Sequence, residues 1–381
     1  MKKILYIVEA FGGGVFTYMV DLANAMCEEF DVTIAYALRD QTPENYFSYF
    51  DKRIHMVRVN HFTRSIGLRG DIQAYFELRE LIRKIQPDIL HFHSSKAGVL
   101  GRFAASSRIP MFYTPHGYSF LMSSHSQKHR KLYKWIEKIC GLRKCMTVAV
   151  SKGEYEVALT VTRRATYVSN GVNLHDLQGL LLERTIVSSQ YSEAAVSAEG
   201  RHPIVCTLGR ICDQKNPATF NAIAAQFPDL TFYWIGDGYL REQLTAPNIV
   251  ITGWVERNKA LQLMQKADVF ILPSLWEGLP MSLLEAMYLE KICIVSNIIG
   301  NRDVIVDGKN GYLVEDTKGF CDRLQQILDT GLESMEFIRH EARADVEREY
   351  NTTVMAEKYA ALYHQAEAKA QREAQKVQHQ S

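Results

Sequence analysis

The sequence lacks the features that mark several common classes of protein. Its 381 residues contain no apolar run long enough to span a bilayer. Its 44 Lys and Arg balance 43 Asp and Glu to a net charge of +1, so no excess of positive charge indicates a nucleic acid partner. The seven cysteines form no CxxC pair, which argues against a disulfide framework and against a zinc site. We therefore expect a cytoplasmic globular protein.

Strand and helix patterns alternate along the chain, which is typical of parallel sheets with crossover helices. A helix is expected from Val15 to Phe30. One series of strands is predicted at 3–8, 32–37, 54–59, 89–93, 111–114 and 146–150, and a second at 204–208, 231–235, 249–252, 269–272 and 292–296. The interdomain connection is placed in or near residues 175–202, which show no clear pattern. The chain thus reads as two α/β domains.

Two carboxylates flank one strand-to-helix turn of the second series. Glu277 follows the apolar run Asp268–Ser274, and Glu285 lies in a helix expected from Met281 to Glu290, with Pro280 suited to its first position. Ligands of open α/β sheets bind at the carboxyl ends of the strands, so a binding site is expected here. The alternative is that both glutamates are ordinary surface charges.

Two other turns carry groups suited to phosphate. Arg210 and Lys215 follow the strand at 204–208, and Lys215 lies just before Asn216-Pro217, a plausible helix start. Two cations beside a helix N-terminus make a pyrophosphate pocket, although either one alone is more often a surface residue. Residues 12–14, three glycines between the first strand and the first helix, suit a phosphate or form a simple turn.

The Glu277-x7-Glu285 spacing, with Gly-Leu-Pro inside it, resembles the donor-site motif of glycosyltransferase family 4, the "glycosyl transferases group 1" enzymes of GT-B fold. Further motifs of that family follow in order: Gly12-Gly13-Gly14, His116-Gly117, Val150-Ser151, Asn170-Gly171-Val172, Gly209-Arg210 with Lys215, Gly236-Asp237-Gly238 and Asn310-Gly311-Tyr312-Leu313. The resemblance implies two Rossmann-like α/β/α domains facing across a cleft. Residues 1–172 would form the acceptor-side domain, 173–352 the nucleotide-sugar-binding domain, and about 353–381 a C-terminal helix packing back on the first.

The resemblance also assigns roles to residues. Arg210 and Lys215 would neutralise the leaving nucleotide diphosphate, Glu285 would bind the ribose hydroxyls, and Glu277 would bind hydroxyls of the transferred sugar. His116 would contact the donor sugar, which makes His116, Arg210, Lys215 and Glu277 the candidate catalytic residues. The remaining donor-binding candidates are Gly13, Gly14, Gly236, Val255, Gly278, Leu279, Pro280 and Met281. His91 and His93 share one strand, and we expect at most one of them to face a cleft.

The implied activity is retaining transfer of a sugar, with UDP-sugar as the expected donor, to a hydroxyl of a glycan or lipid-linked glycan. Capsule, exopolysaccharide or lipopolysaccharide assembly is the expected setting. The chain has no Asp-x-Asp motif, so fixed cations would replace a metal, and no cofactor is expected. The family's mechanism is front-face attack, and no general base is assigned. The alternatives are a nucleotide-sugar epimerase of similar architecture and a nucleotide-sugar-binding protein without turnover.

Residues 128–145 are strongly basic. They carry seven Lys or Arg against the single acid Glu137, interleaved with Tyr133, Trp135 and Ile136. Basic amphipathic helices of this kind lie on anionic membranes, which predicts peripheral contact with the inner face of the membrane. The alternative is a solvated helix whose apolar side covers the first sheet.

Overall fold

The computed structural model describes residues 1–63, 67–179 and 202–378. It divides the chain into two compact units, Met1–Asn170 with Thr352–Ser381, and Gly171–Asn351. The domain boundaries expected at 172/173 and 352/353 lie within two residues of these. The boundary between residues 170 and 171 lies just before residues 175–202, in or near which the sequence predicts the interdomain connection. Residues 174–179 of that stretch are helical, and 180–201 lie outside the described residues.

The first unit is built on a parallel sheet. Among the described residues its strands follow the order β3-β2-β1-β4-β5-β6-β7. The strands are β1 (Lys2–Phe11), β2 (Phe30–Leu38), β3 (His55–Arg58), β4 (Ile89–His93), β5 (Met111–Thr114), β6 (Met146–Ala149) and β7 (Ala165–Tyr167). The helices are α1 (Gly13–Met26), α2 (Leu68–Ile85), α3 (Ser95–Ala104), α4 (Gln127–Cys140), α5 (Lys152–Ala158) and α12 (Thr352–Gln378). The short edge strand β7 was not predicted.

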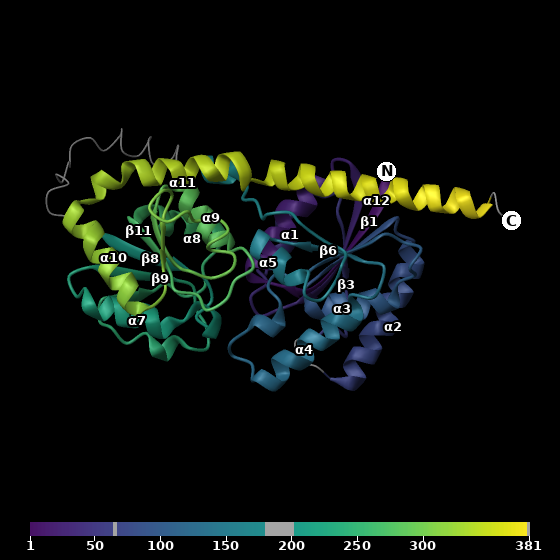
Figure 1. Ribbon diagram of the computed structural model, residues 1–381, viewed down its shortest axis with the longest axis horizontal. Coiled ribbons are helices and arrows are strands. Elements are labelled where there is room, and N and C mark those ends of the chain that lie inside the picture. Colours follow the sequence, from purple (N-terminus) through teal and green to yellow (C-terminus); the bar gives the residue numbers. More distant parts are fainter. Residues whose placement is uncertain (64–66, 180–201, 379–381) are drawn as a thin grey trace. The chain divides into compact units, whose positions relative to one another are not determined.

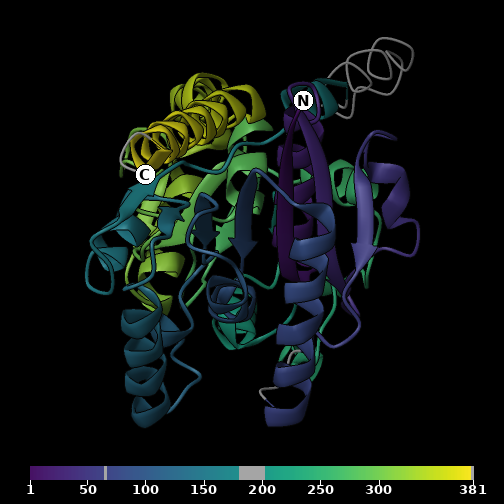
Figure 2. The same ribbon diagram turned by 90° about the vertical axis from the view of Figure 1, so that its right-hand side faces the viewer.

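Alternation along β1 sorts this unit into layers. Ile4, Tyr6 and Val8 pack with α1 and α12, whereas Leu5 and Ile7 pack with α2 and α3 on the opposite face. Successive side chains of a strand point to opposite faces, so a strand buried on both sides is apolar throughout. Figures 1 and 2 show α12, in yellow, on the sheet face opposite to α2.

Of two helices predicted for this unit, the first has different bounds and the second packs where it was expected. The helix predicted from Val15 to Phe30 runs from Gly13 to Met26, because Phe30 begins β2 and pairs with Lys2 of β1. The C-terminal helix expected on the first domain is α12. Its Tyr359 and Tyr363 are fully buried in the core of the first unit.

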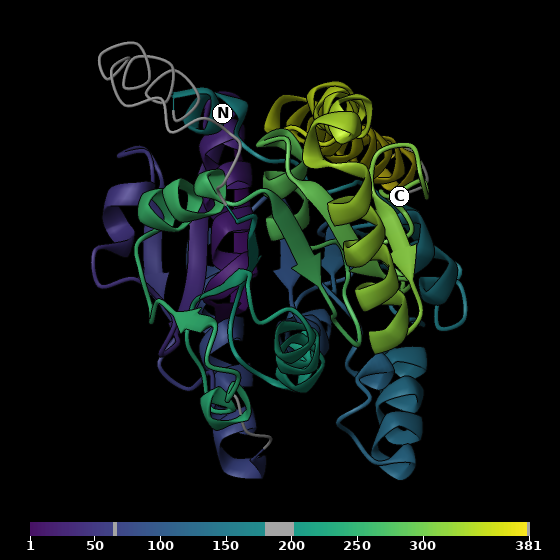
Figure 3. The same ribbon diagram turned by 90° about the vertical axis from the view of Figure 1, so that its left-hand side faces the viewer.

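The second unit has a parallel sheet of the same type. Among the described residues its strands follow the order β10-β9-β8-β11-β12-β13. They are β8 (Ile204–Leu208), β9 (Thr231–Ile235), β10 (Ile249–Ile251), β11 (Val269–Leu272), β12 (Ile292–Ser296) and β13 (Tyr312–Val314). The helices are α7 (Pro217–Gln226), α8 (Arg257–Lys266), α9 (Met281–Tyr288), α10 (Thr317–Thr330) and α11 (Glu336–Glu349). Core side chains of α7 and α10 cover one face, and Figure 3 shows α10, in yellow-green, alongside the strands.

Each sheet has one point where the strand order reverses, between β1 and β4 in the first and between β8 and β11 in the second. The loops that leave two such neighbouring strands diverge to opposite faces and leave room for a ligand at the carboxyl edge. These two edges position the candidate site residues. No helix within the described ranges combines the length and apolarity that a bilayer-spanning segment needs.

Candidate active site

The β8 and β11 loops of the second unit meet through a buried ion pair. Lys215 Nζ lies 2.7 Å from Glu277 Oε1, with the two side chains 14% and 7% exposed. Gln214 Nε2 donates to Glu277 Oε2 and to the Trp276 carbonyl oxygen, both at 3.0 Å. Both carboxylate oxygens are therefore engaged, and the Lys215 charge is held by a neighbour that a diphosphate would have to displace or share.

The helix start beside this pair forms as the sequence predicts. Asn216 is the N-cap of α7, its side-chain oxygen accepts from the Thr219 N–H, and Pro217 takes the first helical position. Asn216 adopts a left-handed backbone with φ 51°, which asparagine tolerates better than most residues. Lys215 is thereby fixed one residue before a positive helix end.

Arg210 differs from Lys215 because its guanidinium makes no hydrogen bond or ion pair within the described part of the chain. The residue is partly buried, and only Gly209 separates it from the end of β8. A partly buried cation without a protein partner suits an incoming anion. Arg210 and Lys215 thus lie on one loop, one cation unpaired and the other paired with Glu277.

Glu285 lies in α9, every residue of which is buried. Its Oε1 is 2.8 Å from Arg257 Nη1, and the residue is 2% exposed. Burial raises the pKa of Glu285, and the Arg257 charge opposes that rise. The surface-charge alternative is therefore wrong for Glu285, and Glu277, at 8% exposure, is buried as well.

The turn between the two glutamates opens α9. Gly278, Leu279 and Pro280 lead into the helix, which begins at Met281. Pro280 was expected at the first helical position, but its ψ of 120° is extended and makes it the N-cap. The first N–H groups of a helix have no partner within it, so this turn presents donors beside Glu277.

The other donor-site candidates of this unit lie at neighbouring strand ends. Gly236 follows β9 and bridges to Gly253, and a Cβ on Gly236 would lie 2.3 Å from the Gly209 carbonyl oxygen. This close approach explains by packing alone, without any ligand, why position 236 is occupied by glycine. Val255 is partly buried after β10, and the adjacent Trp254 is 56% exposed.

The first unit has its own polar cluster at the carboxyl ends of β1 and β4. Glu9 accepts from Ser94 Oγ at 3.3 Å and pairs with Arg39. Gly13 begins α1 with φ 55°, a left-handed conformation that glycine adopts readily, and Gly14 follows it. A side chain at either glycine would meet nothing within 4 Å, so the N-terminus of α1 has open space around it.

His116 lies beyond the end of β5 in a strained backbone, with φ 55°. Sterically unfavourable backbone at a strand end is a common property of functional sites. Its Nε2 is 3.1 Å from His93 Nδ1, and its ring meets Tyr18 edge-on at 4.6 Å between centroids. Burial lowers the pKa of His116 to about 3, so the imidazole is neutral near pH 7.

Behind His116 lies a buried row of hydrogen-bonding side chains. The His91 and His93 rings are 4.1 Å apart between centroids, and His91 Nδ1 is 2.7 Å from the Tyr363 hydroxyl of α12. The expectation that at most one of these histidines faces a cleft assumed that they alternate between faces; that assumption is wrong, although both side chains are fully buried. Residues i and i+2 of a strand share a face, so both rings lie on the α1 and α12 side of the sheet.

Sequence reasoning missed several residues of these clusters. Gln214 and Arg257 hold the two glutamates of the second unit, and Glu9 and Ser94 occupy the edge of the first. Gln214 adjoins Lys215, which was predicted, and Glu9 directly follows the strand predicted at 3–8, so position offered a signal for both. Arg257 offered none, because its ion pair depends on how α8 packs against α9.

The sequence of this chain is similar to those of known proteins. The "Glycosyltransferase Family 4" description matches residues 12–176, and "Glycosyl transferases group 1" matches residues 202–330. The chain is 31% identical over 329 residues, 79% of its length and 81% of the relative's, to the Escherichia coli UDP-Gal:alpha-D-GlcNAc-diphosphoundecaprenol alpha-1,3-galactosyltransferase. The chain belongs to glycosyltransferase family 4.

Solved structures show that this family 4 glycosyltransferase has the GT-B fold. Sucrose-phosphate synthase from Thermosynechococcus elongatus aligns with a TM-score of 0.79 at 18% identity, covering 97% of this chain and 100% of that one. Anabaena HepE in complex with UDP-glucose aligns with a TM-score of 0.73 at 15% identity, covering 96% and 100%. The two parallel α/β units are thus the two Rossmann-like domains of a GT-B glycosyltransferase.

Proposed function

We propose that this glycosyltransferase is retaining and metal-independent, and that it moves a sugar from a UDP-sugar to a hydroxyl of a lipid-linked glycan. Capsule, exopolysaccharide or lipopolysaccharide assembly is the proposed setting. The E. coli relative, whose name specifies UDP-Gal and a diphosphoundecaprenol acceptor, supports the substrate classes. The observation that carries the proposal is the cluster of Arg210, Lys215 and Glu277 at the carboxyl edge of the second sheet.

In this proposal the two cations act on the leaving group. Negative charge grows on the diphosphate as the glycosidic bond breaks, and preorganised cations stabilise a transition state that carries such charge. Arg210 meets the diphosphate directly, and Lys215 reaches it by exchanging Glu277 for a phosphate oxygen. Glu277 is then available to a hydroxyl of the transferred sugar, so donor binding itself assembles this part of the site.

The remaining roles follow the same chemistry. Glu285, held by Arg257, accepts from the ribose hydroxyls, because a carboxylate offers two acceptor oxygens to adjacent hydroxyls. The acceptor hydroxyl attacks the face from which the diphosphate leaves, and its proton passes to the departing phosphate. His116 is neutral, so it contributes hydrogen bonds and not positive charge.

The test begins with binding and ends with the product. Thermal shift against UDP-, GDP- and ADP-sugars identifies the base, since a ligand of the native state raises apparent stability. Transfer to a diphosphate-linked glycan acceptor is then followed by proton NMR of the new anomeric centre. An α-linked product from an α-linked donor supports retention, and a β-linked product refutes it. Conversion of the UDP-sugar to its epimer without acceptor would favour an epimerase, and binding without turnover a binding protein.

We also propose peripheral contact with anionic membrane through residues 128–145. In α4 the exposed side chains Leu132 and Trp135 are 48% and 60% accessible, and Leu142 beyond the helix is 80% accessible. Lys131 and Lys138 are exposed on either side of Trp135. Glu137 faces inward, where it pairs with Arg102 at 2.9 Å. The outward face is therefore cationic and apolar together, the combination found in helices that lie at the membrane interface.

A further inference from the structure

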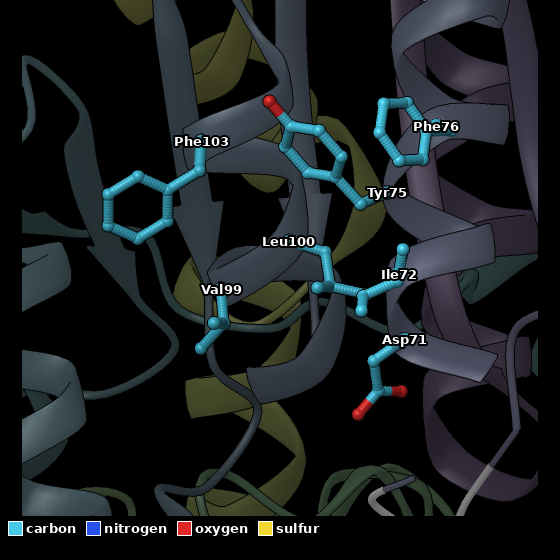
Figure 4. A pocket seen from close by; sticks show the side chains of 7 residues that line it. All are labelled: Asp71, Ile72, Tyr75, Phe76, Val99, Leu100 and Phe103. Atoms are coloured by element: carbon cyan, nitrogen blue, oxygen red, sulfur yellow. The ribbon is translucent and has the colours of Figure 1, made fainter. Parts of the chain in front are cut away.

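A groove of about 550 Å³ opens between α2 and α3 of the first unit. Apart from the Asp71 carboxylate and the Tyr75 hydroxyl, its lining is apolar, as Figure 4 shows. The apolar side chains are Ile72, Tyr75 and Phe76 from α2 and Val99, Leu100 and Phe103 from α3. The volume lies within the range of sites for small organic ligands.

The residues of α2 that line the groove are different from those that pack in the core. The core side of α2 is formed by Ala74, Leu78 and Ile82. Ile72 and Phe76 each precede a core residue by two positions, which places them about 200° around the helix from it. They are 48% and 60% exposed. Exposed apolar side chains that gather in one place mark an interaction site more often than single ones do.

The direction of the groove relates it to the edge of the sheet. Asp71 lies in the first turn of α2, and Lys96 in the first turn of α3 is 2.5 Å from it. Only Ser94 separates the end of β4 from the start of α3. This ion pair therefore lies near the carboxyl edge of the sheet. Phe76 and Phe103 lie further along the two helices. The groove therefore has a polar end near that edge and an apolar body leading away from it.

The apolar body continues toward the basic α4 region. The Arg143 guanidinium lies over the Phe103 ring at 5.7 Å, and Arg143 Nε donates to the Arg102 carbonyl oxygen of α3. Leu142, the neighbour of Arg143, is 80% exposed, which is high for a large apolar side chain. Figure 2 shows α2 and α4 both extending past the strands on one side of this unit. Groove and basic helix thus form neighbouring parts of one surface.

We propose that this groove holds the isoprenoid chain of the lipid-linked acceptor. The inference rests on the proposed function. The enzyme would then recognise the hydrocarbon chain of the acceptor in addition to its diphosphate and its sugar. A branched, flexible hydrocarbon chain fits an open channel lined by aliphatic and aromatic side chains. The basic surface beside it matches the anionic bilayer from which such a chain would emerge, which favours an isoprenoid over a protein helix as occupant.

The test measures affinity against chain length without a bilayer. Isopentenyl, geranyl and farnesyl diphosphate carry five, ten and fifteen carbons on one headgroup, and their binding is followed by titration calorimetry. The wild type should gain about tenfold or more between the first and the last, the equivalent of about 1.4 kcal/mol. The double variant Phe76→Gln/Phe103→Gln should lose most of that gain and keep its affinity for isopentenyl diphosphate. Phe47→Gln changes another exposed phenylalanine, 57% accessible, outside the groove, and should behave as the wild type.

Several outcomes would overturn the proposal. The wild type could show no dependence on chain length, or the double variant could retain it. The double variant could also bind farnesyl diphosphate normally but lose anionic vesicles, which would make the groove a bilayer contact. Sugar transfer that proceeds without chain-length dependence would refute the groove alone. Groove binding without any sugar transfer would refute the proposed function and leave the groove standing.

Discussion

The ion pair between Lys215 and Glu277 leads to an unusual expectation: removing the Glu277 charge should not weaken nucleotide binding. Glu277 holds Lys215 at 2.7 Å in the structure, so a diphosphate must compete with it. The variant Glu277→Gln keeps the side-chain volume and an oxygen for Gln214 but releases the lysine charge. A phosphate about 6 Å from the glutamate would escape a repulsion of roughly 3 kcal/mol for each unit of its negative charge, taking an effective dielectric of about 20.

Screening and side-chain rearrangement reduce that figure, so UDP should bind to Glu277→Gln as tightly as to the wild type or up to about tenfold more tightly. Glu285→Gln should behave in the opposite way. It removes a charged acceptor for the ribose, and hydrogen bonds to charged groups contribute about 1.5–3 kcal/mol, or roughly ten- to a hundredfold in affinity. Both variants should lose sugar transfer.

Calorimetric titration of UDP into the two variants measures the difference. Glu242→Gln serves as the matched control, because Glu242 is exposed and makes no ion pair among the described residues of the same unit. If Glu277→Gln weakens UDP as much as Glu285→Gln does, Glu277 belongs to the nucleotide site and the exchange of Lys215 between glutamate and phosphate is wrong.

Three further predictions address the cations, the histidines and the basic helix. Transfer should survive EDTA, and Arg210→Met or Lys215→Met should lower its rate about a hundredfold, the usual cost of removing one charge stabiliser; dependence on added magnesium would contradict this. Burial lowers the pKa of His116 to about 3 and those of His91 and His93 well below their usual value, so the unfolded chain binds more protons as pH falls below about 6.5. The free energy of unfolding should then fall by about 1.4 kcal/mol per pH unit for each histidine that stays neutral, and urea curves that agree at pH 7 and pH 5 would exclude this. A variant with Lys128, Lys131 and Lys138 changed to Glu should lose salt-sensitive co-sedimentation with anionic vesicles and keep UDP affinity, whereas equal sedimentation would leave α4 a solvated helix.

Local patterns were enough to locate most of the strands, because a parallel strand buried on both faces is predominantly apolar. The strands β4, β5, β8, β9, β11 and β12 match their predicted bounds for this reason. The helix start at Asn216-Pro217 was equally readable, since an N-cap and a first-turn proline act within one turn. Edge strands β7 and β13, three residues each, were missed, whereas β10, equally short and also at an edge, was predicted because Ile249, Val250 and Ile251 are all β-branched.

The tertiary structure determines which of the site residues contact one another. The sequence by itself placed Lys215 and Glu277 after the carboxyl ends of strands, because they follow apolar runs, and Glu285 in the helix that comes next. It could not show that Glu277 holds Lys215, 62 residues away, because that contact depends on β8 and β11 being neighbours in the sheet. The same holds for His91, whose partner Tyr363 lies 272 residues along the chain on α12. Strand order and helix docking bring such groups within hydrogen-bonding distance, and they do so through packing energies summed over a whole core, which no local pattern contains.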